Sequence, residues 1–482
     1  MSKKTKKHSN QLFVAIGVAT VLMAMFVVSI RLGHYFQSLE KQTDQLKPYQ
    51  ELYRSLAGYD NPQKTLLVLA NNAEIRTGGG FIGTLGLIKS EKGKIKADSL
   101  VGVYNVDSPY FCNDKNYTQP EYIKSLNSCT SLRDSNNYLD YPNNAQRVLY
   151  FYQLNTAIGV DNVVQITPQV LEVLLGKLGP VYLKDYDLTV TKENFRETVQ
   201  LEVEAGKDKQ QNKDPKSGVI GSLANQLVSR LISKNIIEIK DILPTFQELI
   251  DQKQIVLFSK NNNTQNIIRT IGASGELKTS DENYFMFTES NIAANKSSPY
   301  IKNTINMHQT IMPDGSSQID LNIISNHTSE NKINYIDPNT NQSMWLIGAD
   351  KNYVTLALPK ESQVTNVDAN GQSYDVTKSN NKLLLGYNRS IQPLGQSTAS
   401  FKYTIPTKYL FDNRMVINTT IQKQLGGWPY ELNYSITLPS DSYQLVASTA
   451  KDIKKQVGNS NTLFYNGIVN QDSILSFIYE KH

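Results

Sequence analysis

The sequence predicts a protein of class α/β plus all-β: an N-terminal transmembrane helix and stalk, a mixed α/β layered domain and a C-terminal antiparallel β-sandwich. Three observations predict it: an uncharged run, then alternating helical and strand-like segments, then short segments that alternate apolar and polar residues. We therefore divide the chain into a basic tail, an anchor, a stalk, a mixed domain and a sandwich domain, with the bounds 1–11, 12–30, 31–61, 62–298 and 299–482.

The anchor is a run without charge, LFVAIGVATVLMAMFVVSI, directly behind the basic tail SKKTKK. As a helix this run spans about 28 Å, close to the ~30 Å of a bilayer core. The lysines of the tail favour a cytoplasmic N-terminus, which places the bulk of the chain in the extracellular space. A cleaved signal peptide is the alternative, but its apolar region would be shorter and would end in small residues. We expect an uncleaved signal anchor and a single-pass protein of the cell membrane.

Charge and cysteine content limit the partners and cofactors. Four lysines of the tail account for most of the net charge of +5, so the remainder is close to neutral and predicts no nucleic-acid partner. The two cysteines, Cys112 and Cys129, lie in one polar stretch on the exterior side, where we expect a disulfide; two unpaired thiols are the alternative. Because the chain has only five histidines, we expect neither a metal site nor a cofactor.

The stalk carries apolar residues at heptad spacing between Tyr35 and Leu56. That spacing predicts a helix with one apolar stripe. Since Pro48 interrupts only three heptads, we expect this helix to pack on its own domain; a coiled coil between chains is the alternative.

The mixed domain alternates apolar runs with amphipathic segments. The polar stretch 107–145 is rich in Asn, Asp, Ser and Pro, which predicts a long surface excursion. Pro168 and Gly179 mark the two ends of one helix. We expect strands at TLLVLA (65–70), IGTLGLIKS (82–90), KIKADSLVGVYNV (94–106), VDNVVQIT, VYLKDYDLTVT and QIVLFSK, and helices at AQRVLYFYQLNTAIG (145–159), PQVLEVLLGKLG, SGVIGSLANQLVSRLISK and LPTFQELIDQKQ.

The sandwich domain is predicted from strict alternation of apolar and polar residues. Such alternation is typical of a sheet with one buried and one solvated face. The segments are SQIDLNIIS, YVTLALP, ASFKYTIP, MVINTTIQKQ, ELNYSITLP and SILSFIYE.

One motif, NNAEIRTGGGFIG at residues 71–83, has a pattern that could carry chemistry. Gly78, Gly80 and Gly83 have the spacing of a dinucleotide-binding loop. That loop requires a helix at its third glycine, whereas TLGLIKS here predicts a strand, so we reject a dinucleotide site. The consecutive glycines Gly78, Gly79 and Gly80 predict instead a tight backbone turn that side chains would block.

Polar residues beside this turn form a hypothetical anion site. Arg76 offers a planar fork for a carboxylate or phosphate, and bare backbone N–H groups could complete the site. The alternative, which residue chemistry favours, is that Arg76 pairs with Glu74 or another carboxylate and fixes the turn. The candidate binding residues here are Asn72, Glu74, Arg76, Gly78, Gly79 and Gly80; no catalytic residue is identified.

The run LANNAEIRTGGGFIGTLGLIKSEKGKI resembles the hallmark of a bacterial family known as domain of unknown function 4012. Four later segments are similar to further parts of that family: GVDNVVQITPQVLEVLLGKLGPVYL, KDPKSGVIGSLANQLVSRL, SNIAANKSSPYI and LGGWPYELNYSITLP. The resemblance covers most of residues 60 to 440. It implies a single-pass, exterior-facing envelope protein without an assigned activity, which binds a cell-envelope polymer, a lipid-linked glycan or a protein partner, or has a structural role.

The mixed domain is also distantly similar to the LytR-CpsA-Psr-type phosphotransferases. This resemblance implies an alternative: a transferase or carrier for glycopolymer linked to polyprenyl pyrophosphate. Arg76, helped by Lys216, would hold the pyrophosphate, and Asp or Glu residues would hold Mg²⁺. The alternative requires an apolar tunnel that opens near Arg76. A binding protein requires no cavity there, and Arg76 should be bonded within its own fold.

Overall fold

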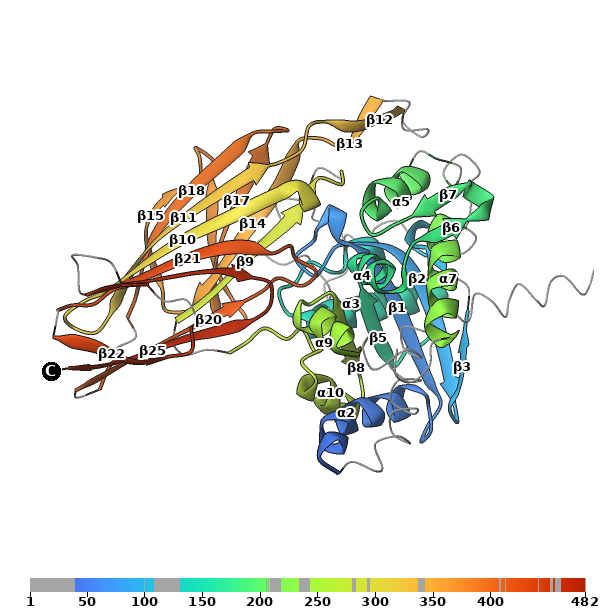
Figure 1. The fold of residues 1–482 in the computed structure, drawn as a ribbon, viewed down its shortest axis with the longest axis horizontal. Helices are drawn as coiled ribbons and strands as arrows, with labels where there is room; N and C mark the ends of the chain where they lie inside the picture. Colours follow the sequence, from blue (N-terminus) through green and yellow to red (C-terminus); the bar gives the residue numbers. More distant parts are fainter. Residues whose placement is uncertain are drawn as a thin grey trace, which may run out of the picture.

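The computed structural model describes most of the chain from Glu40 onward (Figure 1). The described residues are 40–98, 100–107, 131–204, 206, 208, 218–233, 243–279, 283–292, 295–336, 343–406, 409–411, 413–440, 442–450, 454–455 and 461–481. Three expectations fall outside these residues: the anchor at 12–30, the disulfide between Cys112 and Cys129, and the role of Lys216. Every helix in these described ranges is too short or too polar to cross a membrane.

The described part of the stalk is one helix, α2 (Glu40–Leu56), which includes Pro48. Leu52 and Leu56 are buried in the core of the mixed domain. Ser55 Oγ lies 2.6 Å from Thr264 Oγ1 on α10 (Asn262–Thr270), a helix that we did not expect from the sequence. These contacts confirm that the helix packs on its own domain.

A six-stranded sheet forms the centre of the mixed domain. Five strands run in the order β3-β2-β1-β5-β8, and β4 also pairs with β2. Only β1 and β5 are parallel among these pairs of described strands. The strands are β1 (Gln63–Asn71), β2 (Phe81–Glu91), β3 (Lys94–Ala97), β4 (Val101–Gly102), β5 (Asn162–Ile166) and β8 (Ile255–Ser259). The single strand expected over 94–106 is therefore split, and η2 (Val103–Asn105) follows it.

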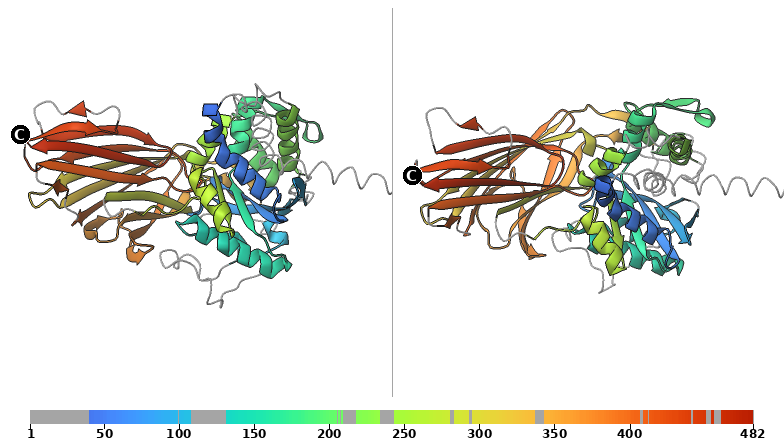
Figure 2. Two further views of the ribbon diagram at one scale, coloured as in Figure 1. Left: turned by 90° about the horizontal axis from the view of Figure 1, so that it is seen from below. Right: turned by 60° about the horizontal axis from the view of Figure 1, so that its bottom comes forward.

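Helices cover both faces of this sheet (Figure 2). Leu67 of β1 packs with α4 (Gln169–Leu178), α7 (Val219–Ser233) and α9 (Leu243–Asp251), whereas Leu66 and Val68 pack with α3 (Tyr141–Thr156) on the other face. Because both faces are buried, the central strands read as continuous apolar runs. The segment VYLKDYDLTVT, which we expected as a strand, is instead a hairpin of β6 (Val181–Leu183) and β7 (Leu188–Val190), with the short 3-10 helix η5 (Lys184–Tyr186) between them. The helix α5 (Phe195–Glu204) follows, and we did not expect it from the sequence.

One expected surface segment is buried. We expected a surface excursion over 107–145, but most of residues 131–139 are covered, around the short helix η4 (Leu132–Asp134). Asn136 is fully buried and accepts a hydrogen bond from the Gly78 N–H (2.8 Å). Polar residues of this segment form hydrogen bonds inside the protein, so their polarity did not mean that the segment is exposed to solvent.

The second half of the chain forms two large sheets that pack face to face (Figure 1). The seven-stranded sheet has the order β15-β18-β11-β10-β21-β24-β23, and the eight-stranded sheet has the order β16-β17-β14-β9-β20-β25-β22, with β19 paired to β20. Their strands are β9 (Asn283–Asn291), β10 (Ile301–Ile311), β11 (Ser317–His327), β14 (Asp350–Pro359), β15 (Gln363–Asp368), β16 (Tyr374–Ser379), β17 (Lys382–Ile391), β18 (Gln396–Ile405), β19 (Leu410–Phe411), β20 (Arg414–Gln422), β21 (Tyr430–Thr437), β22 (Tyr443–Ser448), β23 (Lys454–Lys455), β24 (Thr462–Val469) and β25 (Ser473–Lys481). A separate hairpin joins β12 (Lys332–Ile336) and β13 (Ser343–Ile347). The two large sheets include β9, which lies within the range 62–298 that we assigned to the mixed domain, so the sandwich begins earlier than we expected.

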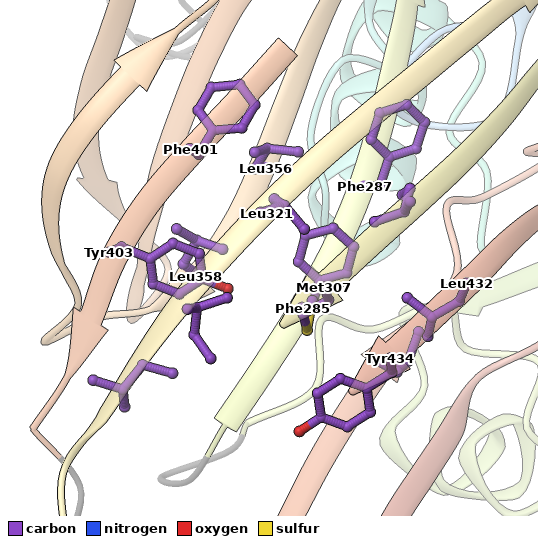
Figure 3. Close-up of a cluster of buried hydrophobic side chains, with 14 of the residues drawn as sticks. Phe285, Phe287, Met307, Leu321, Leu356, Leu358, Phe401, Tyr403, Leu432 and Tyr434 are labelled. Carbon is purple, nitrogen blue, oxygen red and sulfur yellow. The ribbon is translucent and has the colours of Figure 1, made fainter. Parts of the chain in front are cut away.

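The core of the sandwich lies between these sheets. Figure 3 shows aromatic and aliphatic side chains from both sheets, among them Phe285, Leu321 and Tyr434. On β10 and β11 buried residues alternate with half-exposed ones, as the sequence pattern predicts. Every residue of β9 is buried, because Leu139 and Leu277 also cover the outer face of its sheet.

Two strand pairs depart from the expected antiparallel sandwich. β10 pairs in parallel with β21, and β9 pairs in parallel with β20. Both pairs join strands far apart in the sequence, which is what parallel pairing requires, since a short hairpin cannot connect parallel strands. Alternation within one strand carries no information on the direction of its neighbour.

Candidate functional site

The glycine motif is the connection between two antiparallel strands. β1 ends at Asn71, which pairs with Phe81 at the start of β2. Between them, η1 (Asn72–Glu74) begins with the Asn71 side chain accepting a hydrogen bond from Ala73 N–H (3.1 Å). Because a strand follows the glycines, the helix that a dinucleotide site needs is absent from this described segment.

The glycine turn is closely packed against its surroundings. Gly79 and Gly80 have φ of 116° and 133°, and a Cβ on Gly80 would lie 2.6 Å from the carbonyl carbon of Asn71. The Gly78 and Gly79 N–H groups donate to the carbonyls of Asn136 (2.8 Å) and Arg76 (2.9 Å). Both N–H groups are therefore already bonded within the protein, and the expected tight turn is what the structure contains.

The charged residues of the motif form a buried ion-pair network. The Glu74 carboxylate accepts from Arg76 Nη2 and from Lys296 Nζ, each at 2.7 Å. Lys296 also lies 3.4 Å from Glu204 on α5. The side chains of Glu74 and Lys296 are only 5% and 8% exposed. Two acids and two bases thus balance each other in this cluster, which we call the Glu74 network.

The pKa shifts in the Glu74 network follow from its geometry. Burial alone would raise the pKa of Glu74, but Lys296 and Arg76 outweigh it, and the pKa of this carboxyl is lowered. Burial would lower the pKa of Lys296, but the adjacent Glu74 and Glu204 raise it well above its ordinary value. Both residues are therefore ionised at neutral pH.

Arg76 has further partners in both domains. Its Nη1 donates to the carbonyl of Asn291, the last residue of β9. Its guanidinium also lies 5.7 Å from the centre of the Phe81 ring. The guanidinium thus spans Glu74 of the mixed domain and β9 of the sandwich, and its main chemical role in this arrangement is to connect them.

The loop 424–428 of the sandwich inserts beside the same turn. Leu425 is buried in the core of the mixed domain, among residues of the sheet and α3. Gly426 has φ of 59°, and a Cβ there would lie 2.3 Å from the carbonyl oxygen of Gly79. Asn72 Nδ2 donates to the carbonyl of Gly426 (3.0 Å), and Trp428 Nε1 donates to that of Asn72 (3.2 Å). The loop and the motif therefore interlock.

Further contacts hold the place where the motif meets β9, Lys296 and the loop 424–428, which we call the junction between the two domains. Ile75 N–H donates to Ser298 Oγ (3.3 Å), beside η6 (Ser298–Tyr300). Gln424 Nε2 donates to the carbonyl of Arg76 (3.1 Å). Arg196 of α5 stacks 4.5 Å from the ring centre of Trp428 and pairs with Glu172 of α4.

Four segments that resemble one family meet at this junction. The motif itself supplies Glu74 and Arg76, the segment 290–301 supplies Lys296, and the loop 424–428 supplies Trp428. The fourth segment supplies Gln165, whose Nε2 donates to the carbonyl of Gly78 (2.7 Å). We did not identify these partners from the sequence, although their segments share the resemblance, because pairing between residues 87 to 356 positions apart leaves no local pattern.

A polar groove of about 940 Å³ opens elsewhere between the two domains. In it Asp472 pairs with Lys253 (3.0 Å) and Lys278 (3.1 Å). Lys423 is buried nearby, where its Nζ donates to the carbonyls of Gln252 (3.0 Å) and Gly427 (2.5 Å), and burial lowers its pKa to about 7. In the described part of the chain no cluster of three or more His, Cys, Asp or Glu residues could hold a metal ion.

Comparison with solved structures gives weak likenesses. A protein from Legionella pneumophila is 10% identical, with 41% of this chain and 71% of that one covered and a TM-score of 0.28. An M1 zinc metallopeptidase from Deinococcus radiodurans is 12% identical, with 37% and 42% covered and a TM-score of 0.22. A protein from Streptococcus agalactiae is 14% identical, with 44% and 74% covered and a TM-score of 0.26. At these TM-scores the likenesses support no conclusion about function.

Comparison by sequence is more specific. No curated protein matches the chain. Residues 60–203, which contain the glycine motif, α3, α4 and most of α5, match the family described as "Protein of unknown function (DUF4012)", and this match supports the family that the motif indicates.

Proposed function

We propose that this protein is a membrane-anchored component of the cell envelope, with residues 1–11 in the cytoplasm, 12–30 in the membrane and the remainder outside. In this proposal it acts as a binding or structural protein, whose two large domains work as one body. The order of a basic tail and an uncharged run supports the orientation. The match over residues 60–203 supports the family of the mixed domain, but the function of that family is itself unknown.

We base the proposal of a non-catalytic role on one observation: both charged residues of the motif, Glu74 and Arg76, are paired within the junction. Glu74 and Arg76 bind each other, Lys296 and the β9 backbone. An anion would have to displace Glu74 from the buried Lys296 and from the partly buried Arg76 to bind here. Displacing one partner of a buried ion pair is costly, about 3–5 kcal/mol. The geometry therefore favours a motif that joins the domains.

A titration tests this role. The full chain in detergent micelles is titrated with a polyprenyl phosphate, as wild type, Arg76→Ala and Arg54→Ala. Arg54 is the matched control, because it pairs with Asp60 on an exposed surface. We expect no saturable binding by any of the three. Saturable binding by wild type and Arg54→Ala that Arg76→Ala loses would refute the proposal and establish a phosphate site at the motif.

A separate experiment tests the orientation. Protease is added to intact cells, and then to cells broken open, and fragments of the mixed and sandwich domains are followed with antibodies. We expect digestion in intact cells. If both domains resist protease until the cells are opened, the bulk of the chain lies inside and the proposal is wrong.

A further inference from the structure

The outer face of the seven-stranded sheet carries a row of side-chain amides. Asn466, Asn433, Asn306 and Asn322 lie directly opposite one another on the adjacent strands β24, β21, β10 and β11, and Ser400 of β18 continues the row. Asn433 Nδ2 donates to Asn306 Oδ1 (2.8 Å), Asn306 Nδ2 donates to Asn322 Oδ1 (3.4 Å), and Asn466 donates to Asn433. All lie in a groove of about 580 Å³.

The hydrogen bonds along the amide row leave a regular set of free groups. An amide offers two N–H donors and two acceptor lone pairs. Asn306 and Asn433 each donate once and accept once within the row. Each therefore keeps one donor and one acceptor, side by side and half exposed. Such a pair matches two neighbouring hydroxyls, one of which donates while the other accepts.

A second row of side chains runs beside the amide row in the groove, and its positive and negative charges balance. Its charged pair is Asp320 and Lys402, which lie on adjacent strands with 2.7 Å between Oδ1 and Nζ. Beside them His308 Nδ1 lies 2.7 Å from Ser435 Oγ. Phe464 at the end of this row is 39% exposed and gives an apolar surface for a ring. A groove of paired charge, amides and hydroxyls suits a neutral ligand better than an anionic polymer.

We propose that this groove binds a neutral, hydroxyl-rich glycan chain that lies across the strands. The proposal rests on the exterior location given above and adds a site and a ligand class to it. Strands are spaced about 4.8 Å apart, so the row from Asn466 to Ser400 spans about 19 Å over its four intervals. One interval is close to the length of one pyranose ring. The groove therefore fits about four sugar rings, one above each interval.

Binding by the full chain in detergent micelles tests the site. The probes are neutral oligomers of glucose, mannose and N-acetylglucosamine with two to eight rings, measured by calorimetry, and alginate fragments as an acidic comparison. We expect at least one neutral series to bind, with affinity that rises up to about four rings and then levels off. No binding by any neutral series, or tighter binding of alginate than of every neutral series, would overturn the proposal.

Variants locate the site. Asn306→Ala with Asn433→Ala removes two amides, and we expect affinity to fall about thirtyfold. Ser400→Trp leaves the amides in place but fills the groove, and should abolish binding. Asn326→Ala is the matched control, since Asn326 lies on the same face of β11 but outside the groove and should bind as wild type. Unchanged binding in both groove variants, with normal unfolding curves, would overturn the proposal. The protease experiment on cells reports the orientation independently of either result.

Discussion

Glu74→Gln is expected to loosen the junction between the two domains, because it removes the carboxylate that Arg76 and Lys296 share. Glutamine keeps the shape of the side chain but leaves the buried Lys296 and the partly buried Arg76 without its negative charge. Removing one partner of a buried ion pair costs about 3–5 kcal/mol. Since Glu204 still faces Lys296 at 3.4 Å and the Asn291 carbonyl still accepts from Arg76, we expect the lower end, about 3 kcal/mol.

The chain contains a natural reporter of this junction. It has two tryptophans, of which Trp428 lies at the junction and Trp345 is 42% exposed on the β13 hairpin. In a Trp345→Phe background, fluorescence during urea unfolding reports on Trp428 alone. With an m-value of about 3 kcal/mol per M, Glu74→Gln should lower the midpoint of this transition by about 1 M urea.

An exposed ion pair supplies the control for this experiment. Asp98→Asn breaks the pair between Lys89 and Asp98, whose side chains are 49% and 39% exposed. Exposed pairs contribute about 0–1 kcal/mol, so the Trp428 transition should hardly move. If Glu74→Gln shifts the midpoint no more than Asp98→Asn does, the Glu74 network does not hold the junction and the reasoning fails.

Three further results are expected. The pKa of Glu74 is lowered on folding from its ordinary value of 4.5, so this carboxylate stabilises the folded state above pH 4.5 and stops doing so as the pH falls through the lower folded value. Acid should therefore lower the urea midpoint of the Trp428 transition more in wild type than in Glu74→Gln. Gly80→Ala should destabilise by about 3 kcal/mol or more through its positive φ and close contact, whereas Gly83→Ala, with 3.9 Å to its nearest neighbour, should stay within about 1 kcal/mol of wild type in urea unfolding. Because burial lowers the folded pKa of Lys423 to about 7, the unfolded chain binds more protons above that pH, and wild-type stability should rise between about pH 7 and pH 10 relative to Lys423→Met in the same assay.

Local patterns predicted the elements that one segment specifies by itself. The apolar runs of β1 and β8 indicated strands, and the alternation in β11 and β21 indicated strands with one solvated face. Pro168 and Gly179 marked the ends of α4 within a residue. In each of these cases the residues of a single segment are enough to indicate the element.

The features that sequence reasoning missed depend on distant partners. Lys296 reads as an ordinary exposed lysine, and only the fold brings it to Glu74. Asn136 lies in a polar stretch that predicted a surface, yet it is fully buried because the glycine turn needs its carbonyl. The direction of the β9 and β10 partners likewise follows from how the chain crosses between sheets, which no single strand records.

The burial of Leu425 among residues of the sheet and α3 has a consequence for the order of folding. Domains generally fold as units during synthesis, the N-terminal one first. Here the hydrophobic interior of the first domain is completed by a residue that leaves the ribosome long after β8. The first domain should therefore stay partly open, and susceptible to chaperones and proteases, until almost the whole polypeptide has been made.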